Sequence, residues 1–453
     1  MRKFYLVLFI FFISRTVSFS QYNWDNVGNG VNSPVFTLTS DSANNVLYAG
    51  GLFTFSGITP AINIAKWNGS NWSPLGGGIL SGVNVSSMMM SGSDLIAGGT
   101  FTNIGGILTK NIARWDGTAW TSLGAGLEFP GVTIIDALAE YDGDIYAGGV
   151  FTFSGTTLLS NIARWDGVSW QPVGSGINGP VRSLCVYGTE LYAGGSFTNA
   201  GGISVNNMAK WDGSSWSDVG GGMSYTGAVT VSTLTVFSGD LFAGGTFNIA
   251  GTSPVKHLAK WNGINWSDVG GGAGSYTGAT TVSTLTVFGN DLIVGGTLDS
   301  LGTIPVSNIG SWDGSSWIPM GTGTNNSVYA SATLYDTLYT GGLFTMAGGN
   351  VSTFVAEWKP VDPAFLTGTT EFIKSKNGIV YPNPTHDILF FSSPVNGWEI
   401  GFRLYDIAGR EVMNEENVVD HVALDRRKIQ SGLYFYRIIK DNQVIALGQV
   451  SVL

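Results

Sequence analysis

Residues able to do acid–base, nucleophilic or metal chemistry are few and far apart in this chain of 453 residues. It has three histidines, His257, His386 and His421, and one cysteine, Cys185. Copper and zinc sites combine two or more His or Cys ligands, so we predict no metal site and no cofactor. A lone cysteine cannot form a disulfide within the chain. Because Cys185 lies in an apolar stretch, we expect a small buried side chain rather than a nucleophile.

Two carboxylates, Asp136 and Glu140, stand outside the repeated pattern described below. A cluster of carboxylates of this kind is what an extracellular carbohydrate-active enzyme would need. Other acidic residues, such as Asp142 and Asp144, occur where hairpin turns are expected, and turn formation explains them. The sequence contains no calcium loop of EF-hand spacing and no phosphate-binding glycine loop. We therefore expect no catalytic residues and a protein that is not an enzyme.

Aromatic residues in variable segments are the best candidates for ligand contacts. Tyr225 and Tyr276 lie in two near-identical segments, 224–228 and 275–279. Phe129 and Phe153 are expected in loops on the same face of the molecule. Exposed rings beside hydroxyl groups suit a sugar ring or a protein surface, so a protein or glycan ligand is expected here. Local packing of loops after a recent duplication is the alternative explanation.

A repeat positions these loops. The first copy of its motif, Asn-Ile-Ala-Lys-Trp-Asn-Gly-Ser-Asn-Trp, occupies residues 63–72. The first Trp of the motif recurs in steps of 46 to 51 residues, at positions 67, 115, 165, 211, 261, 312 and 358. A period this long indicates a solenoid, an array or a propeller.

Each repeat divides into four short segments without helical periodicity. In the second copy they cover residues 83–90, 94–101, 111–115 and 120–126, and turn residues separate them. Four short antiparallel strands per repeat are typical of a propeller blade. A four-residue loop between Trp115 and Trp120 predicts that the two rings face each other on adjacent strands. The Gly-Gly pair of the second strand is expected to admit a Trp ring from a neighbouring blade.

The count of elements predicts seven blades. The Gly-Gly pair and the first Trp of the motif each occur seven times. A fourth strand follows the third strand in only six of the seven repeats, and the last repeat lacks it. A matching fourth strand lies near the N-terminus, at residues 24–31. We therefore expect this N-terminal strand to complete the last blade and to close the ring, which removes two exposed sheet edges.

The order of these elements resembles kelch repeats. An apolar strand is followed by Tyr-x-Gly-Gly, then Trp-Asp-Gly, then Trp-x-x-Leu, over residues 24–358. Kelch repeats typically carry Tyr-Asp where this chain has Trp-Asp or Trp-Asn, so the resemblance is to a distant, kelch-like group. Kelch-type propellers imply binding far more often than catalysis.

Charge and the first residues point to an exported protein. The formal net charge of −10 would repel nucleic acid, so no nucleic-acid partner is expected. Residues 1–20 combine Arg2 and Lys3, an apolar run over 4–13 and a small-x-small site at 18–20, which is typical of a secretory signal peptide. No segment reaches the ~20 apolar residues of a membrane helix, so no membrane span is expected.

The C-terminal region has a different character. Residues 361–377 are expected to be a linker, and residues 378–453 show alternating strands of a small β-sandwich. Three motifs in this region, at 381–384, 404–410 and 431–436, resemble the type A sorting domain of the type IX secretion system. That resemblance implies handling by the type IX machinery of a Bacteroidota cell, removal of the tail, and release or surface attachment. The sorting residues that it implies are Tyr381, Pro382, Asn383, Pro384, Asp406, Gly409, Arg410, Gly432 and Tyr434.

The sequence thus predicts an all-β chain with four parts. They are a signal peptide (1–20), a seven-bladed β-propeller closed by its N-terminal strand (21–360), a linker (361–377) and a β-sandwich sorting domain (378–453). The leading hypothesis is a secreted or cell-surface binding or adhesion protein whose propeller is an interaction platform. An extracellular carbohydrate-active enzyme and a structural surface-layer component are the alternatives.

Overall fold

A computed structural model describes most of the chain. The described residues are 22–225, 227–275, 278–360, 380–381, 388–391, 400–406, 410–418, 421–425, 427–440 and 443–452. The signal peptide and the linker expected from the sequence lie outside these residues. The chain divides into two compact units, one of which is Trp24–Lys359, and the other contains the C-terminal region.

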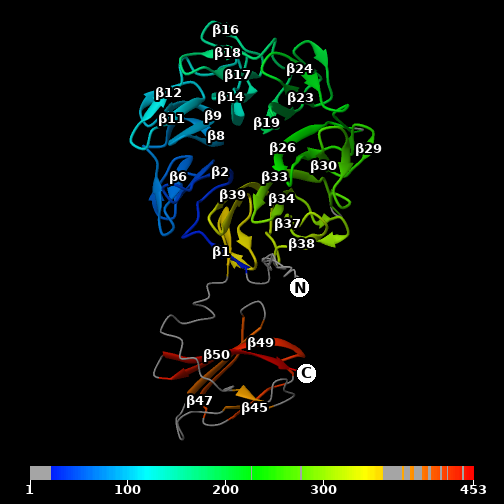
Figure 1. The fold of residues 1–453 in the computed structure, drawn as a ribbon. Helices are drawn as coiled ribbons and strands as arrows, with labels where there is room; N and C mark the ends of the chain where they lie inside the picture. The colour runs from blue at the N-terminus through cyan, green and yellow to red at the C-terminus, as the bar shows by residue number, and fades with distance from the viewer. Residues whose placement is uncertain are drawn as a thin grey trace, which may run out of the picture. The chain divides into compact units, whose positions relative to one another are not determined.

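The larger unit is an all-β propeller in which sheets follow one another around a ring (Figure 1). Each sheet has the same four core strands, ordered from the axis outward. The innermost strands are β2 (Val35–Asp41), β8 (Ile79–Ser91), β13 (Ile134–Tyr141), β19 (Val181–Tyr187), β26 (Thr230–Phe237), β33 (Thr281–Phe288) and β39 (Val328–Leu334). The second strands are β3 (Val46–Gly51), β9 (Asp94–Ile104), β14 (Asp144–Val150), β20 (Glu190–Gly195), β27 (Asp240–Thr246), β34 (Asp291–Thr297) and β40 (Thr337–Gly342).

The outer half of each sheet is shorter. The third strands are β6 (Ile64–Trp67), β11 (Ile112–Trp115), β17 (Ile162–Trp165), β23 (Met208–Trp211), β30 (Leu258–Trp261), β37 (Ile309–Trp312) and β43 (Val355–Pro360). The outermost strands are β7 (Trp72–Pro74), β12 (Trp120–Ser122), β18 (Trp170–Pro172), β24 (Trp216–Asp218), β31 (Trp266–Asp268), β38 (Trp317–Pro319) and β1 (Tyr22–Asn26). The sheet that contains β39, β40 and β43 thus takes its outermost strand from the other end of the propeller sequence.

A pair of Trp rings joins the two outer strands of every sheet. Trp115 and Trp120 are directly opposite each other, as the sequence predicts, and their ring centroids are 5.3 Å apart. Trp24 on β1 and Trp358 on β43 form the equivalent pair at 5.1 Å. Such aromatic pairs contribute about 0.5–1.5 kcal/mol beyond the area that they bury.

The expectation that Trp rings pack on the Gly-Gly pairs is wrong. A Cβ added to Gly341, the first glycine of one pair, would lie 2.5 Å from Cγ1 of Val35 on the innermost strand of the next sheet. The Trp rings instead meet glycines that follow the outermost strands: a Cβ on Gly28 would lie 2.8 Å from the ring of Trp67. The reason is the distance of each element from the propeller axis. The Gly-Gly pairs lie near the axis, where neighbouring sheets are close together, whereas the Trp rings lie at the periphery.

Short hairpins connect the second and third strands, and we call them linking hairpins. They comprise β4 (Phe55–Ser56) with β5 (Thr59–Pro60), the end of β9 with β10 (Ile107–Leu108), β15 (Phe153–Ser154) with β16 (Thr157–Leu158), β21 (Asn199–Ala200) with β22 (Ile203–Ser204), β28 (Ile249–Ala250) with β29 (Ser253–Pro254), β35 (Ser300–Leu301) with β36 (Ile304–Pro305), and β41 (Met346–Ala347) with β42 (Asn350–Val351). The sequence analysis did not predict these hairpins, because two-residue strands carry too little periodicity.

The C-terminal region forms two sheets. One contains β44 (Val380–Tyr381), β45 (Ile388–Phe391) and β48 (His421–Ala423). The other has the order β47 (Glu411–Val418), β46 (Ile400–Tyr405), β49 (Gly432–Lys440) and β50 (Gln443–Val452). Phe402 is fully buried and its ring stacks on that of Tyr436 at 6.0 Å between centroids. No helix in the described part of the chain is long and apolar enough to cross a membrane.

Candidate functional site

One face of the propeller is built from two kinds of loop. Crossover loops run from the outermost strand of one sheet to the innermost strand of the next, and each meets a linking hairpin of that next sheet. In two sheets a short crossover strand, β25 (Met223–Ser224) or β32 (Ala273–Gly274), pairs with the hairpin. In four sheets a single bridge makes the same connection, as Glu128 does with Phe153, and in the remaining sheet the start of β8 pairs with the end of β9. We call this surface the loop face, and its loops share one side of the ring as the sequence predicts.

The loop face carries most of the exposed apolar side chains. Of the 21 large hydrophobic residues that are exposed in the described part of the chain, 16 lie in linking hairpins, in crossover loops or at the start of β8, which occupies the place of a crossover loop. They are Leu52, Phe55, Ile58, Ile62, Leu80, Val83, Leu108, Phe129, Val132, Leu158, Ile203, Tyr225, Ile249, Leu343, Met346 and Val351. A concentration of this kind on one side is what an interaction surface requires.

Phe129 and Phe153 are brought together on this face. Glu128 bridges to Phe153, and Phe129 is the next residue along the crossover loop. Phe129 is 42% exposed, whereas Phe153 is half-buried in β15. The neighbouring Lys110 holds Glu128 in an ion pair of 2.7 Å. The bridge therefore places the exposed ring of Phe129 on the loop next to the half-buried Phe153.

Tyr225 lies in the crossover loop after β25 and is 43% exposed. Its ring is 6.5 Å from that of His257, which directly precedes β30, the third strand of the next sheet. His257 has a backbone φ of 59°, the left-handed value that Asn111, Asn161, Asn207 and Asn308 adopt at the equivalent positions. It is therefore a turn residue, and burial lowers the pKa of its ring. Tyr276 lies outside the described residues, so Tyr225 is described without its counterpart.

A second cluster surrounds the propeller axis, where every innermost strand has a β-bulge at the same position. The bulged residues are Phe36, Ser86, Asp136, Arg182, Ser232, Ser283 and Tyr329, and each is half-buried. A bulge redirects a side chain, so one residue per sheet is turned out of the regular alternation. Asp136 and Arg182 form an ion pair, and the rings of Phe36 and Tyr329 are 5.9 Å apart.

The sequence analysis missed this axial ring. A signal for it exists, because a Val or Ile precedes and a Ser, Thr or Ala follows the bulged position in each repeat, while the residue between them varies in charge and size. Recognising it requires knowing that the strand is bulged, which depends on pairing with the second strand.

The other residues considered for chemistry are not assembled into a site. Asp136 pairs with Arg182, and Glu140 accepts a hydrogen bond of 3.1 Å from Ser91. Burial raises the pKa of Asp136, although Arg182 opposes the shift. Cys185 is partly buried, and burial raises the pKa of its thiol to about 11, which is unsuited to a nucleophile. Among the residues that the structure describes, no group of three or more His, Cys, Asp or Glu side chains could hold a metal ion.

The C-terminal motif residues support turns. Asp406 accepts bonds from the Nε and backbone N–H of Arg410 at 2.8 and 3.0 Å, which ties Arg410 to the end of β46. Tyr434 is buried in β49 and donates its hydroxyl to Gln430 O at 2.9 Å, and Gly432 begins that strand. Tyr381 lies in β44. Pro382, Asn383, Pro384 and Gly409 lie outside the described residues.

Comparison with known proteins identifies this C-terminal region. A family described as the secretion system C-terminal sorting domain matches residues 379–449. The protein therefore carries a type IX sorting domain, and it is exported to the cell surface or the extracellular space. No curated protein sequence matches the chain.

Solved structures similar to the chain include three proteins of low sequence identity. PorZ, an essential surface component of the type IX secretion system of Porphyromonas gingivalis, is 14% identical, with 93% of this chain and 59% of PorZ covered and a TM-score of 0.48. The extracellular domain of the putative hybrid two-component system BT3049 of B. thetaiotaomicron is 12% identical, with 95% and 57% covered and a TM-score of 0.44. The WD40 β-propeller domain of Doa1 is 11% identical, with 74% and 96% covered and a TM-score of 0.47. The chain thus spans less than two thirds of the length of the first two.

Proposed function

We propose that this protein is a binding or adhesion protein of the cell surface or the extracellular medium, and that its loop face is the contact surface. In this proposal the propeller is seven-bladed and kelch-like, closed by β1, and the tail engages the type IX secretion machinery. The protein is not an enzyme in this proposal. The partner is a protein or a glycan outside the cell.

The observation that carries the proposal is the distribution of exposed apolar residues. Sixteen of 21 lie on the loop face, and most of them occupy hairpins whose backbone is fixed by pairing with a crossover loop. A ligand that covers this face would gain apolar contact without ordering the loops, which lowers the entropic cost of binding. Loops held on a rigid scaffold are the usual place for such contacts.

The placement of the carboxylates favours binding over glycoside hydrolysis. Asp136 and Glu140 lie four residues apart on β13, so about 13 Å of strand separates them. Glycosidase carboxylates lie about 5–9.5 Å apart and face one substrate bond. Asp136 is also committed to Arg182. A binding protein needs no such pair.

The test is binding of the secreted protein to an array of glycans and extracellular matrix proteins. We expect selective binding that a double variant, Phe129→Ser with Tyr225→Ser, reduces at least about tenfold, because both exposed rings are removed. The matched control is Val168→Ser with Ile264→Ser, two exposed apolar residues of the hairpins between third and outermost strands. Equal loss in both double variants, or no binding to the array by a folded protein, would contradict the proposal.

A further inference from the structure

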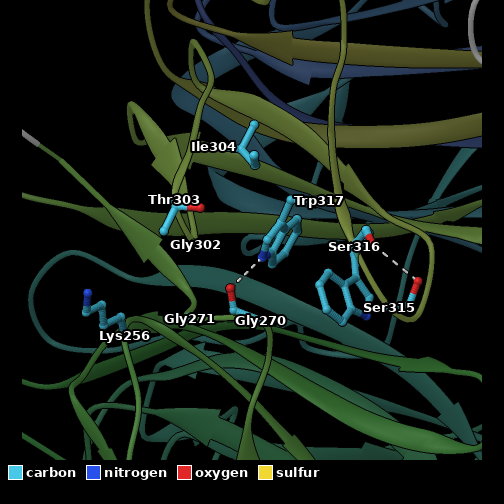
Figure 2. A pocket seen from close by; sticks show the side chains of 10 residues that line it. Lys256, Gly270, Gly271, Gly302, Thr303, Ile304, Ser315, Ser316 and Trp317 are labelled. Carbon is cyan, nitrogen blue, oxygen red and sulfur yellow. Dashed lines mark hydrogen bonds between the residues drawn. The ribbon is translucent and has the colours of Figure 1, made fainter.

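A pocket of about 320 Å³ lies between two neighbouring sheets at the outer part of the propeller (Figure 2). One wall comes from Lys256, Gly270 and Gly271 of the sheet that ends with β31. The other comes from the turn between β35 and β36 and from the hairpin between β37 and β38. The lining side chains are Lys256, Thr303, Ile304, Trp312, Ser315, Ser316 and Trp317. The volume is at the lower end of the range of about 300–1,000 Å³ for ligand pockets.

A shifted hydrogen bond distinguishes this junction from the others. At the equivalent junctions the indole N–H of the outermost Trp donates to the residue before the glycine, as Trp266 does to Val219 O at 2.8 Å. Trp317 instead donates to Gly270 O itself, at 3.0 Å, the bond drawn in Figure 2. Trp312 is half-buried, as is its counterpart Trp165, whereas Trp211 and Trp261 are 7% and 5% exposed. The shifted bond is made at this junction and not at the other six.

Lys256 also differs from its counterparts in neighbouring sheets. Lys110 occupies the same position in its own sheet and forms an ion pair with Glu128. In the crossover loop beside Lys256, the position of Glu128 is taken by Gly274, which has no charged side chain. Asn206, again at the same position, donates to Gly221 O at 2.9 Å. Lys256 has neither contact and no ion pair among the residues that the structure describes. It is exposed, and it is the one charged residue among those that line the pocket.

We propose that this pocket binds a sugar unit that carries a carboxylate, such as the uronic acid of an acidic polysaccharide. In this proposal Lys256 pairs with the carboxylate, and the exposed part of Trp312 contacts a C–H face of the sugar ring. The side-chain hydroxyls of Thr303 and Ser316 form hydrogen bonds with sugar hydroxyls. The proposal rests on the binding role proposed above and adds a ligand class at a place distinct from the Phe129 and Tyr225 loops.

The charge of the site decides between anions. A single ammonium group matches a carboxylate, which carries one negative charge, whereas a phosphate group would need further cations or a set of backbone N–H donors. The backbone N–H groups of Gly271 and Ser315 do not serve as phosphate donors, because they already donate to Asp268 and Asp313. The three hydroxyl side chains of the lining favour a hydroxyl-rich ligand over a carboxylate on a peptide. Export places the pocket where polysaccharides occur.

The test is calorimetric titration of the secreted protein with trisaccharides of galacturonic, glucuronic and mannuronic acid. We expect at least one of the three to bind. Its methyl ester should bind at least about tenfold more weakly, and the affinity for the acid should fall with added salt. Lys256→Asn introduces the asparagine that stands at the equivalent position, 206, of the neighbouring sheet. It should weaken binding about ten- to hundredfold. Lys110→Asn is the matched control and should leave binding unchanged. Ser316→Ala introduces the residue found at the equivalent position, Ala119, and should weaken binding less than Lys256→Asn does.

The outcomes separate this proposal from the first. Binding of no uronate, equal affinity for acid and ester, equal loss in Lys256→Asn and Lys110→Asn, or equal affinity for a triglutamate peptide would each overturn it. Array binding that depends on Phe129 and Tyr225 would persist in those cases if only the pocket proposal is wrong. Conversely, uronate binding that survives Phe129→Ser with Tyr225→Ser would support the pocket even if the loop face binds nothing on the array.

Discussion

The indole N–H of Trp24 donates a 2.7 Å hydrogen bond to the carbonyl of Met320, which lies 296 residues later in the chain. Trp72, Trp120, Trp170, Trp216 and Trp266 each make the same bond to the preceding sheet, at 2.8–3.4 Å. The bond from Trp24 therefore joins β1 and β38 in the same way as consecutive sheets are joined. Together with the pairing of β1 and β43, it holds the N-terminal strand to the far end of the propeller sequence.

Loss of this bond should destabilise the propeller. Trp24→Phe keeps a buried ring but leaves the carbonyl of Met320 without its donor, so we expect a loss of about 1–3 kcal/mol in the free energy of unfolding. Urea denaturation followed by tryptophan fluorescence measures it. Trp72→Phe is the matched variant within the chain and should lose a similar amount. A change below about 0.5 kcal/mol for Trp24→Phe alone would show that β1 contributes little to the ring.

Any side chain larger than glycine at position 341 should destabilise the propeller, because the neighbouring sheet leaves no room for it. In Gly341→Ala the new methyl group would overlap Val35, and overpacking of this kind costs about 1–3 kcal/mol. The double variant Gly341→Ala with Val35→Ala should recover part of that loss, because the overlapping methyl groups are gone. A double-mutant cycle in urea measures the coupling. Strictly additive losses would contradict the contact between these two residues.

The pairing of Asp136 with Arg182 should make stability depend on pH. Burial raises the pKa of Asp136 in the folded protein, so its contribution is fully present below the pKa of the unfolded chain and is lost as pH rises through the folded pKa. Arg182→Ala should raise that pKa further and steepen the loss as pH rises above about 4, the ordinary pKa of an aspartate. Asp136→Asn should flatten the same profile. Urea midpoints measured across this pH range test both, and a steeper profile in Asp136→Asn than in the parent would refute the assignment.

Removal of the sorting domain should block secretion. A chain that lacks residues 378–453 is expected to stay in the periplasm, and immunoblots of periplasm, outer membrane and medium detect it. Asp406→Ala should reduce secretion less severely, because it removes only the bonds that tie Arg410 to the end of β46. Asp425→Ala breaks a similar exposed pair, with Arg427, outside the three motifs and serves as the control. Normal release of the truncated protein would contradict the role of the tail.

Local sequence signals predicted the parts of the fold that depend on a single repeat. The spacing of Trp115 and Trp120 fixes a four-residue hairpin, so their opposition could be derived from the chain alone. Three segments of that repeat, expected at 83–90, 94–101 and 111–115, lie within or nearly match β8, β9 and β11. The fourth is shorter than expected, because Gly124 and Gly126 adopt positive φ angles and end the strand after Ser122.

Features that arise between repeats could not be predicted in the same way. The wrong assignment of Trp rings to the Gly-Gly pairs came from ignoring how far from the axis each element lies. The bulge at Asp136 depends on its register with β14, and beside the pocket one indole bond is made to Gly270 rather than to Val269. The bulged position is marked only by its neighbours, a preceding Val or Ile and a following Ser, Thr or Ala, and the shifted indole bond has no counterpart in the local pattern of residues. Tyr225 was identified as exposed, but its contact with His257 joins two sheets and needed the structure.

The pairing of β1 with β43 imposes an order on folding. Residues of β1 are made first, yet the partner strand begins only at Val355, so the first strand stays unpaired until almost the whole propeller has been synthesised or carried across a membrane. Contacts between such distant residues form slowly. Until then the chain exposes one free strand and one open sheet edge, both able to pair with another copy. Arrest of translation or transport before residue 355 would therefore produce the species most prone to aggregate, whereas arrest after residue 360 would leave β1 paired with β43.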